Sequence, residues 1–289
     1  MRPFAYERPA SLDEAIATLG RHGAEARLLA GGTDLIIRLR DGTLQPSVVV
    51  DVKGVAELDT GIRETTTGLI IGARAVMTDI AADTRIRRDH AALAEAAAVV
   101  GAVQIRNRAT LAGNLCNASP AADTAPALLV DVARVVVAGP AGRRVVAVDD
   151  LFVASGVTTL APDEIVTAIE LPRPTAPRGT VHLRRTRRRG HDLASVTLAC
   201  AVGADGITRL AYGSLGPRPL LVTDDTGLLA DAAAPDDAKR ARLAVLVADA
   251  SPSPRSMRAG PEYRRAMLGV LGLRAVHTAI QRLADAGPR

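Results

Sequence analysis

Two stretches decide the fold: Leu28-Leu29-Ala30-Gly31-Gly32-Thr33-Asp34-Leu35 and Thr110-Leu111-Ala112-Gly113-Asn114-Leu115. Glycine allows backbone N–H groups to converge on an anion, because no Cβ blocks a close approach or a positive φ. In the first stretch, Thr33 and Asp34 open an apolar run that predicts a short helix over 34–39. The loop then lies at a helix N-terminus, where anions are favoured. Together the stretches predict a pyrophosphate site held from two sides.

Neither stretch has the spacing of a known nucleotide motif. A Rossmann loop would read G-x-G-x-x-G, and a P-loop would end in a lysine followed by serine or threonine. Simple nucleotide-triphosphate binding is therefore not expected. A Gly-Gly turn before a helix is, by itself, more often structural than functional. The assignment of a pyrophosphate site therefore depends on the residues around the two stretches.

The first stretch lies in a small α/β unit. Ser11 and Glu14 form a capping box that predicts a helix start, with apolar residues following at helical spacing. Strands are expected at 27–30, entering the glycine loop, and at 48–52. We therefore expect a first subdomain of about 1–55.

The second stretch lies in a larger unit of strands and helices. Strands are expected at 69–73, 134–138, 143–148 and 164–171, and helices from about Thr78, at 91–100 and at 121–131. Pro172, Pro174 and Pro177 then interrupt the pattern. This second subdomain spans 56–175 and completes a first domain of 1–175.

A smaller domain of 178–289 follows. Strands at 195–202 and 207–212 flank the turn Gly203-Ala204-Asp205-Gly206, which predicts an antiparallel hairpin. Helices are expected at about 236–249 and 261–286. The predicted fold class is α+β.

Composition narrows the function. The formal charge is +5, and there is no Trp. Two cysteines, Cys116 and Cys200, are too few for an iron–sulfur cluster, which usually takes four thiolates. The five histidines share no metal-ligand spacing, so no metal is expected, and no catalytic residue is assigned. Since no apolar run approaches the roughly 18 residues of a membrane span, we expect a cytoplasmic protein without one.

Longer motifs identify a family. Ala30–Leu35 and the run Gln104-Ile105-Arg106-Asn107-Arg108-Ala109-Thr110-Leu111-Ala112-Gly113-Asn114-Leu115 resemble the two pyrophosphate loops of the FAD-binding (medium) subunit of the xanthine dehydrogenase and carbon monoxide dehydrogenase family of molybdenum hydroxylases. The resemblance extends from about Tyr6 to about Ala284. Ala112 replaces the first glycine of the family's Gly-Gly pair, a departure that costs about 1 kcal/mol if the position needs positive φ.

Further matches extend the resemblance toward the flavin. Ser119-Pro120-Ala121-Ala122-Asp123 matches the family's aspartate at the ribityl chain or nearby groups, although an Asp here also fits a simple helix cap. Val166 falls where an apolar residue lies near the isoalloxazine. Arg184-x-x-x-Arg188-x-x-x-Asp192-x-Ala194 resembles the family's Lys-x-x-x-Arg-x-x-x-Asp-x-Ala, with Arg184 in place of the lysine. Arginine retains the cation but arranges its donors differently.

The resemblance implies an FAD-binding domain of the vanillyl-alcohol-oxidase (PCMH) type in two subdomains, followed by a smaller α+β domain with an antiparallel sheet and helices. It implies FAD as the cofactor. The implied binding residues are Leu29, Ala30, Gly31, Gly32, Thr33, Asp34, Leu35, Thr110, Ala112, Gly113, Asn114, Asp123, Val166 and Arg184.

The resemblance also implies a place in a complex. The chain would be the flavoprotein of a heterotrimer, with a [2Fe–2S] small subunit and a molybdopterin large subunit. It would pass electrons from the [2Fe–2S] partner, through FAD, to a small-molecule or carrier acceptor. The sequence identifies neither the substrate of the complex nor the acceptor.

Two other classes of function stay open. One is a stand-alone FAD oxidoreductase, and the other is a flavin-free binding or scaffold protein. The arginine-rich cluster Arg184–Arg189 also fits phosphate contacts of a nucleic-acid-binding module. We expect no nucleic acid, however, because the cluster lies in a predicted strand whose alternate side chains face opposite ways.

Overall fold

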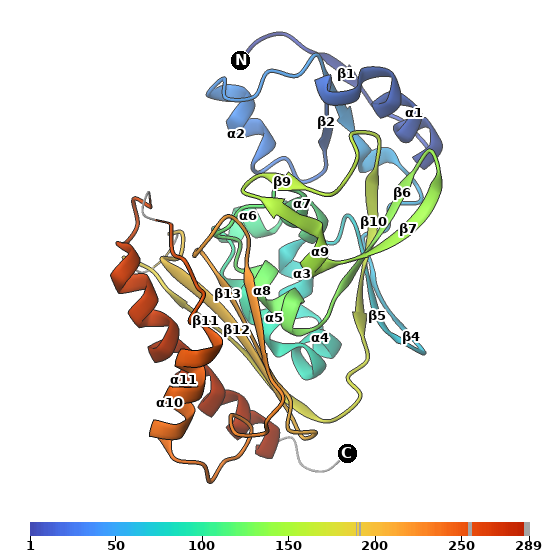
Figure 1. The fold of residues 1–289 in the computed structure, drawn as a ribbon. Helices are drawn as coiled ribbons and strands as arrows, with labels where there is room; N and C mark the ends of the chain where they lie inside the picture. Colours follow the sequence, from blue (N-terminus) through green and yellow to red (C-terminus); the bar gives the residue numbers. More distant parts are fainter. Residues whose placement is uncertain (189, 191, 254–255, 286–289) are drawn as a thin grey trace.

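The computed structural model describes residues 1–188, 190, 192–253 and 256–285. It arranges them as three main sheets with helices between and beside them (Figure 1). The N-terminus lies beside the first sheet, and the C-terminal helices lie against the third.

The first sheet is small and parallel. Its strand order is β1-β3-β2, and both outer strands run parallel to β3. Ser11 Oγ accepts a hydrogen bond from Glu14 N, and Glu14 Oε2 accepts one from Ala10 N, so the predicted helix start is confirmed. The elements are β1 (Ala5–Glu7), α1 (Leu12–His22), β2 (Ala26–Leu29), α2 (Leu35–Arg40) and β3 (Val48–Asp51).

The second sheet is antiparallel, with the order β4-β5-β10-β6-β7. Its central strand β10 pairs Ile169 with Ile71 on one side and with Val135 on the other. A register shift between Val166 and Ala168 interrupts the pairing with β6. The strands are β4 (Ile62–Thr65), β5 (Gly68–Gly72), β6 (Arg134–Gly139), β7 (Gly142–Ala147) and β10 (Ile165–Pro172), and a small hairpin of β8 (Phe152–Ala154) and β9 (Val157–Thr158) lies outside this sheet.

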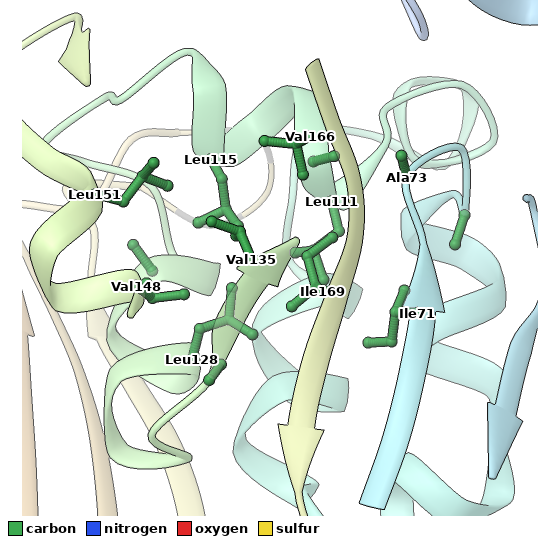
Figure 2. Packing of buried hydrophobic residues seen from close by; sticks show 14 of the residues in the cluster. Ile71, Ala73, Leu111, Leu115, Leu128, Val135, Val148, Leu151, Val166 and Ile169 are labelled. Carbon is green, nitrogen blue, oxygen red and sulfur yellow. The ribbon is translucent and has the colours of Figure 1, made fainter. Parts of the chain in front are cut away.

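Short helices cover this sheet and form one hydrophobic core with it. Figure 2 shows Ile71, Val135 and Ile169 of the sheet beside Leu111 and Leu128 of the helices. Burial of these apolar side chains provides the main stabilisation of this part of the chain. The helices are α3 (Met77–Ala82), α4 (Thr84–Asp89), α5 (Ala91–Ala98), α6 (Val103–Arg106), α7 (Leu111–Cys116), α8 (Thr124–Val130) and α9 (Val148–Leu151).

The third sheet is antiparallel in the order β11-β12-β13-β14, which confirms the predicted hairpin. Side chains of β12 alternate: Ala199 and Ala201 join the core with α5 and α8, while Leu198 and Cys200 join a second core with α11. The sheet is therefore covered by helices on both faces. The elements are β11 (Arg178–Arg185), β12 (Val196–Gly203), β13 (Thr208–Gly213), β14 (Leu220–Asp224), α10 (Asp236–Leu246) and α11 (Pro261–Asp285).

Three local expectations need correction. The second glycine stretch is not an open loop, because Leu111–Cys116 forms α7. Strand β11 ends at Arg185, so only the first two arginines of the basic cluster lie in a strand; Arg189 lies outside the described residues. The short strands β1, β4, β8, β9 and β14 have no counterpart among the expected strands.

Candidate cofactor-binding site

The first glycine stretch forms a turn between β2 and α2. Gly32 has φ +77°, and its carbonyl accepts a hydrogen bond from Ile36 N at 3.0 Å. Within the part of the chain that is described, the N–H groups from Gly31 to Leu35 donate to no protein acceptor. These donors suit an anionic group, as the sequence predicts.

The second stretch is fixed by its own capping and by the segment between β5 and α3. Thr110 caps α7, since its Oγ1 accepts a hydrogen bond from Gly113 N at 3.1 Å. Leu111 N donates to Ala75 O at 3.2 Å. Ala112 lies inside α7 and is absent from the positive-φ residues that the described chain contains. Alanine therefore carries no backbone strain at this position.

The first stretch is in direct contact with the residues that lead into the second. A Cβ built on Gly31 would overlap the carbonyl oxygen of Arg108 and would lie 3.1 Å from the Cα of Ala109. Thr110 follows immediately in the sequence. Glycine at position 31 is required by this close approach, which joins the first loop to the segment before α7.

The contact series continues from the second stretch to Asp123. Asn114 Oδ1 accepts a hydrogen bond from Thr124 Oγ1 at 2.6 Å, and Thr124 follows Asp123 at the start of α8. Asp123 precedes the helix without capping it, because its side chain accepts no hydrogen bond from the first turn. Its carboxylate is thus available for another role.

Arg184 of β11 neutralises this carboxylate. Its Nη1 lies 2.7 Å from Asp123 Oδ2, and the two side chains are 16% and 7% exposed. Nη1 also donates to Val99 O at 3.3 Å. The structure thus brings together Asp123 and Arg184, two residues that the sequence assigns to the same cofactor.

His182 belongs to this cluster, although the sequence reasoning did not name it. Its Nε2 lies 2.9 Å from Thr197 Oγ1 and 3.4 Å from Asp123 Oδ1. His182 is two residues before Arg184, so period-two alternation places both side chains on one face of β11. That spacing is the signal that could have identified it.

Opposing effects act on the Asp123 carboxyl. Burial raises its pKa, but His182 and Arg184 lower it by more, so the pKa lies below the usual aspartate value. Asp123 is therefore ionised at neutral pH. Its Oδ1 atom is buried and has no hydrogen-bond partner among the described residues.

The remaining predicted residues lie along the same region with different exposure. Val166 is 5% exposed and lies in the core with Leu111 and Leu115 (Figure 2). Leu29 ends β2 and pairs with Asp51. Ala30, Gly31, Gly32, Thr33 and Leu35 are half-buried, and Asp34 is exposed. Gly113 is exposed, whereas Thr110 is buried.

The described residues contain no cluster of three or more His, Cys, Asp or Glu that could bind a metal ion. Among the same residues, no helix is both long enough and apolar enough to cross a bilayer. Cys116 and Cys200 are free thiols.

The comparisons with known proteins agree with the geometry. Residues 2–174 match the family described as FAD binding domain in molybdopterin dehydrogenase, and residues 181–279 match the CO dehydrogenase flavoprotein C-terminal domain. The class of protein is therefore an FAD-binding flavoprotein with an oxidoreductase role.

Individual relatives make the class more specific. The chain is 32% identical to the carbon monoxide dehydrogenase medium chain of Hydrogenophaga pseudoflava, covering 97% of this chain and 98% of the relative. It is 34% identical to the xanthine dehydrogenase FAD-binding subunit of Escherichia coli O157:H7, covering 75% of each. A solved structure of carbon monoxide dehydrogenase from Hydrogenophaga pseudoflava superposes with a TM-score of 0.89 at 30% identity, covering 98% of this chain and 99% of the other.

The chain belongs to the family of FAD-binding medium subunits of molybdenum hydroxylases. The predicted family, the fold class and FAD as the cofactor are thereby confirmed. The residues present fit this cofactor, since the first loop offers free N–H donors and Asp123 Oδ1 is a buried acceptor without a partner.

Proposed function

We propose that this chain is the electron-transfer subunit of a molybdenum hydroxylase complex. In this role it receives electrons from a [2Fe–2S] small subunit and delivers them to a small-molecule or carrier acceptor, while a molybdopterin large subunit oxidises the substrate. FAD supplies the redox chemistry when bound. The protein contributes binding, orientation and electrostatics.

One observation carries the proposal: three contacts link the first loop to the segment before α7, α7 to Thr124, and Asp123 to Arg184. We infer that the free N–H groups of the first loop hold the pyrophosphate, with the start of α7 lying beside it. Asp123 then accepts hydrogen bonds from hydroxyl groups of the cofactor, and Arg184 contributes a cation near the ring. Val166 would support the ring from β10.

The cofactor would lie between two domains, which we place at 1–175 and 178–289. The third sheet supplies Arg184, while the glycine loops and Asp123 come from the first domain. Residues from both domains thus meet at one ion pair. The two free cysteines fit a reducing compartment, and we place the protein in the cytoplasm.

The flavin-free alternative loses its main support. The departure at Ala112 does not favour it, because Ala112 lies in a regular helix without positive φ. No feature of the described residues favours a stand-alone oxidoreductase over a subunit of a complex.

The visible absorption spectrum of the purified chain tests cofactor binding, together with identification of any compound released on denaturation. Released FAD at about one equivalent is the expected result, and a colourless protein that takes up no added FAD would contradict it. Affinity purification from the native host then tests the complex. Recovery of an iron–sulfur protein and a molybdopterin protein is expected, while recovery of the chain alone with full substrate turnover would favour the stand-alone enzyme.

A further inference from the structure

His182 is buried between β11, β12 and α5. Its backbone N donates to Glu95 Oε2 of α5 at 2.8 Å, and Glu95 Oε1 in turn accepts from Arg282 Nη2 of α11 at 2.6 Å. The ring approaches Thr197 Oγ1 of β12 at 2.9 Å. His182 is 7% exposed and Thr197 is fully buried. Both the backbone and the ring of His182 thus have hydrogen-bond partners on neighbouring elements.

The two oxygens of Asp123 differ in how they are held. Oδ2 is fixed by Arg184 at 2.7 Å. Oδ1 accepts no hydrogen bond, and the ring nitrogen Nε2 of His182 lies 3.4 Å from it. The side chain makes no bond to the first turn of α8, so its orientation depends on Arg184, His182 and the Thr197 hydroxyl.

Charge reinforces this geometry. The groups that face the carboxylate are Arg184 and His182 from β11 and the Thr197 hydroxyl from β12. A buried carboxylate with a single partner would be costly to keep ionised. Histidine beside the second oxygen lowers that cost, because an adjacent donor favours the charged form.

We propose that His182 is a positioning residue of the flavin site, which holds Oδ1 of Asp123 so that the carboxylate faces the cofactor's hydroxyl groups in a single orientation. The proposal rests on the proposed function, because it assigns Asp123 to FAD. His182 itself acts through Asp123 and does not react. No similar constraint is available from Arg184, which is committed to the other oxygen.

Two variants distinguish the loss of the hydrogen-bond donor from a change in side-chain volume. His182→Met fills similar space without a donor, whereas His182→Gln retains a nitrogen donor at the end of the side chain. His277→Met serves as the control, since His277 is a half-exposed histidine of α11 paired with Asp236. Circular dichroism and urea unfolding establish that each variant is folded.

The first readout needs no cofactor. Carboxyl ¹³C NMR of the FAD-free chain, assigned by comparison with Asp123→Asn, follows the titration of Asp123. In His182→Met the midpoint should move to higher pH, in His182→Gln it should move less because a donor is retained, and in His277→Met it should stay near the parent protein. An unchanged midpoint in folded His182→Met would overturn the positioning role.

The second readout is the affinity for FAD, measured by fluorescence quenching. His182→Met should bind FAD about tenfold more weakly, because the Asp123 carboxylate loses the close contact that orients it, while His182→Gln should stay within about threefold. Equal affinity of His182→Met and the parent would count against the proposal. If the parent chain itself bound no FAD, the proposed function would fail, and the NMR titration would still decide whether His182 controls Asp123.

Discussion

Gly31 and the carbonyl oxygen of Arg108 approach so closely that no side chain fits between them. The contact joins the turn after β2 to the segment that leads into α7, so the two glycine stretches act as a unit. Displacing one must displace the other. This relationship has a direct experimental consequence for cofactor binding.

Gly31→Ala should weaken FAD binding at least about tenfold, or by about 1.4 kcal/mol. The added methyl would overlap Arg108 O, which is backbone and cannot move aside without shifting Thr110. Isothermal titration with FAD measures the effect. Gly20→Ala in α1 is the matched control, because a Cβ there meets nothing within 4 Å. Equal losses in both variants would contradict the role of the loop contact.

Gly32→Val should nearly abolish FAD retention. Gly32 has φ +77°, and a Cβ there would lie 2.9 Å from Leu29 Cδ1 and 3.1 Å from Ile36 Cδ1. Gly156→Val separates local blocking from general strain, because Gly156 has a similar φ of +74° but open space around it. The flavin-to-protein ratio after purification should drop only in Gly32→Val. Normal flavin content in folded Gly32→Val would disprove the loop assignment.

Ala112→Gly, which restores the residue of the family pattern, should lower the free energy of unfolding by about 0.5–1 kcal/mol. Ala112 lies within α7 and is 5% exposed, so glycine adds backbone entropy and removes packing. FAD affinity should not improve, since no positive φ needs relief. Urea unfolding measures the change in stability, and FAD titration measures the change in affinity. A gain in stability or affinity would mean that alanine strains the loop.

The sequence predicts the glycine loops better than it predicts the side-chain contacts around them. Glycine restricts backbone geometry locally, so the stretches around Gly31 and Gly113 stand out without any tertiary information. The ion pair of Asp123 with Arg184 depends instead on how β11 lies against α8, and only the family motifs indicated both residues. His182 was missed because its role arises from the register of β11 with β12 and from Asp123 being left uncapped.

The prediction of strand boundaries is inaccurate for a similar physical reason. The arginines after Arg185 continue the composition of β11, yet the strand ends there and Arg187 N donates to Asp192 Oδ2 at 3.2 Å. Side-chain bonds in the following turn thus compete with the sheet. Short edge strands such as β1 have too few residues for alternation to be visible.

A second buried ion cluster should matter for stability. Asp131 at the end of α8 lies 2.6 Å from Arg178 Nη2 of β11 and 3.0 Å from His90 Nδ1. Arg178→Met leaves the carboxylate with one partner and should cost about 3–5 kcal/mol of unfolding free energy. The double variant Asp131→Asn/Arg178→Met should recover part of it. Arg63→Met, which removes an exposed pair with Asp59, should cost less than about 1 kcal/mol.

The same cluster predicts acid sensitivity. Burial raises the pKa of Asp131, but Arg178 and His90 lower it by more, so its pKa in the folded protein is below the usual value. A depressed carboxyl pKa contributes stability that is complete above the unfolded value of about 4 and is lost as the pH falls through the folded value. Urea unfolding from pH 6 to pH 3 should therefore show a steeper loss for the parent chain than for Asp131→Asn. Identical slopes would mean that Asp131 does not contribute to the pH dependence of the unfolding free energy.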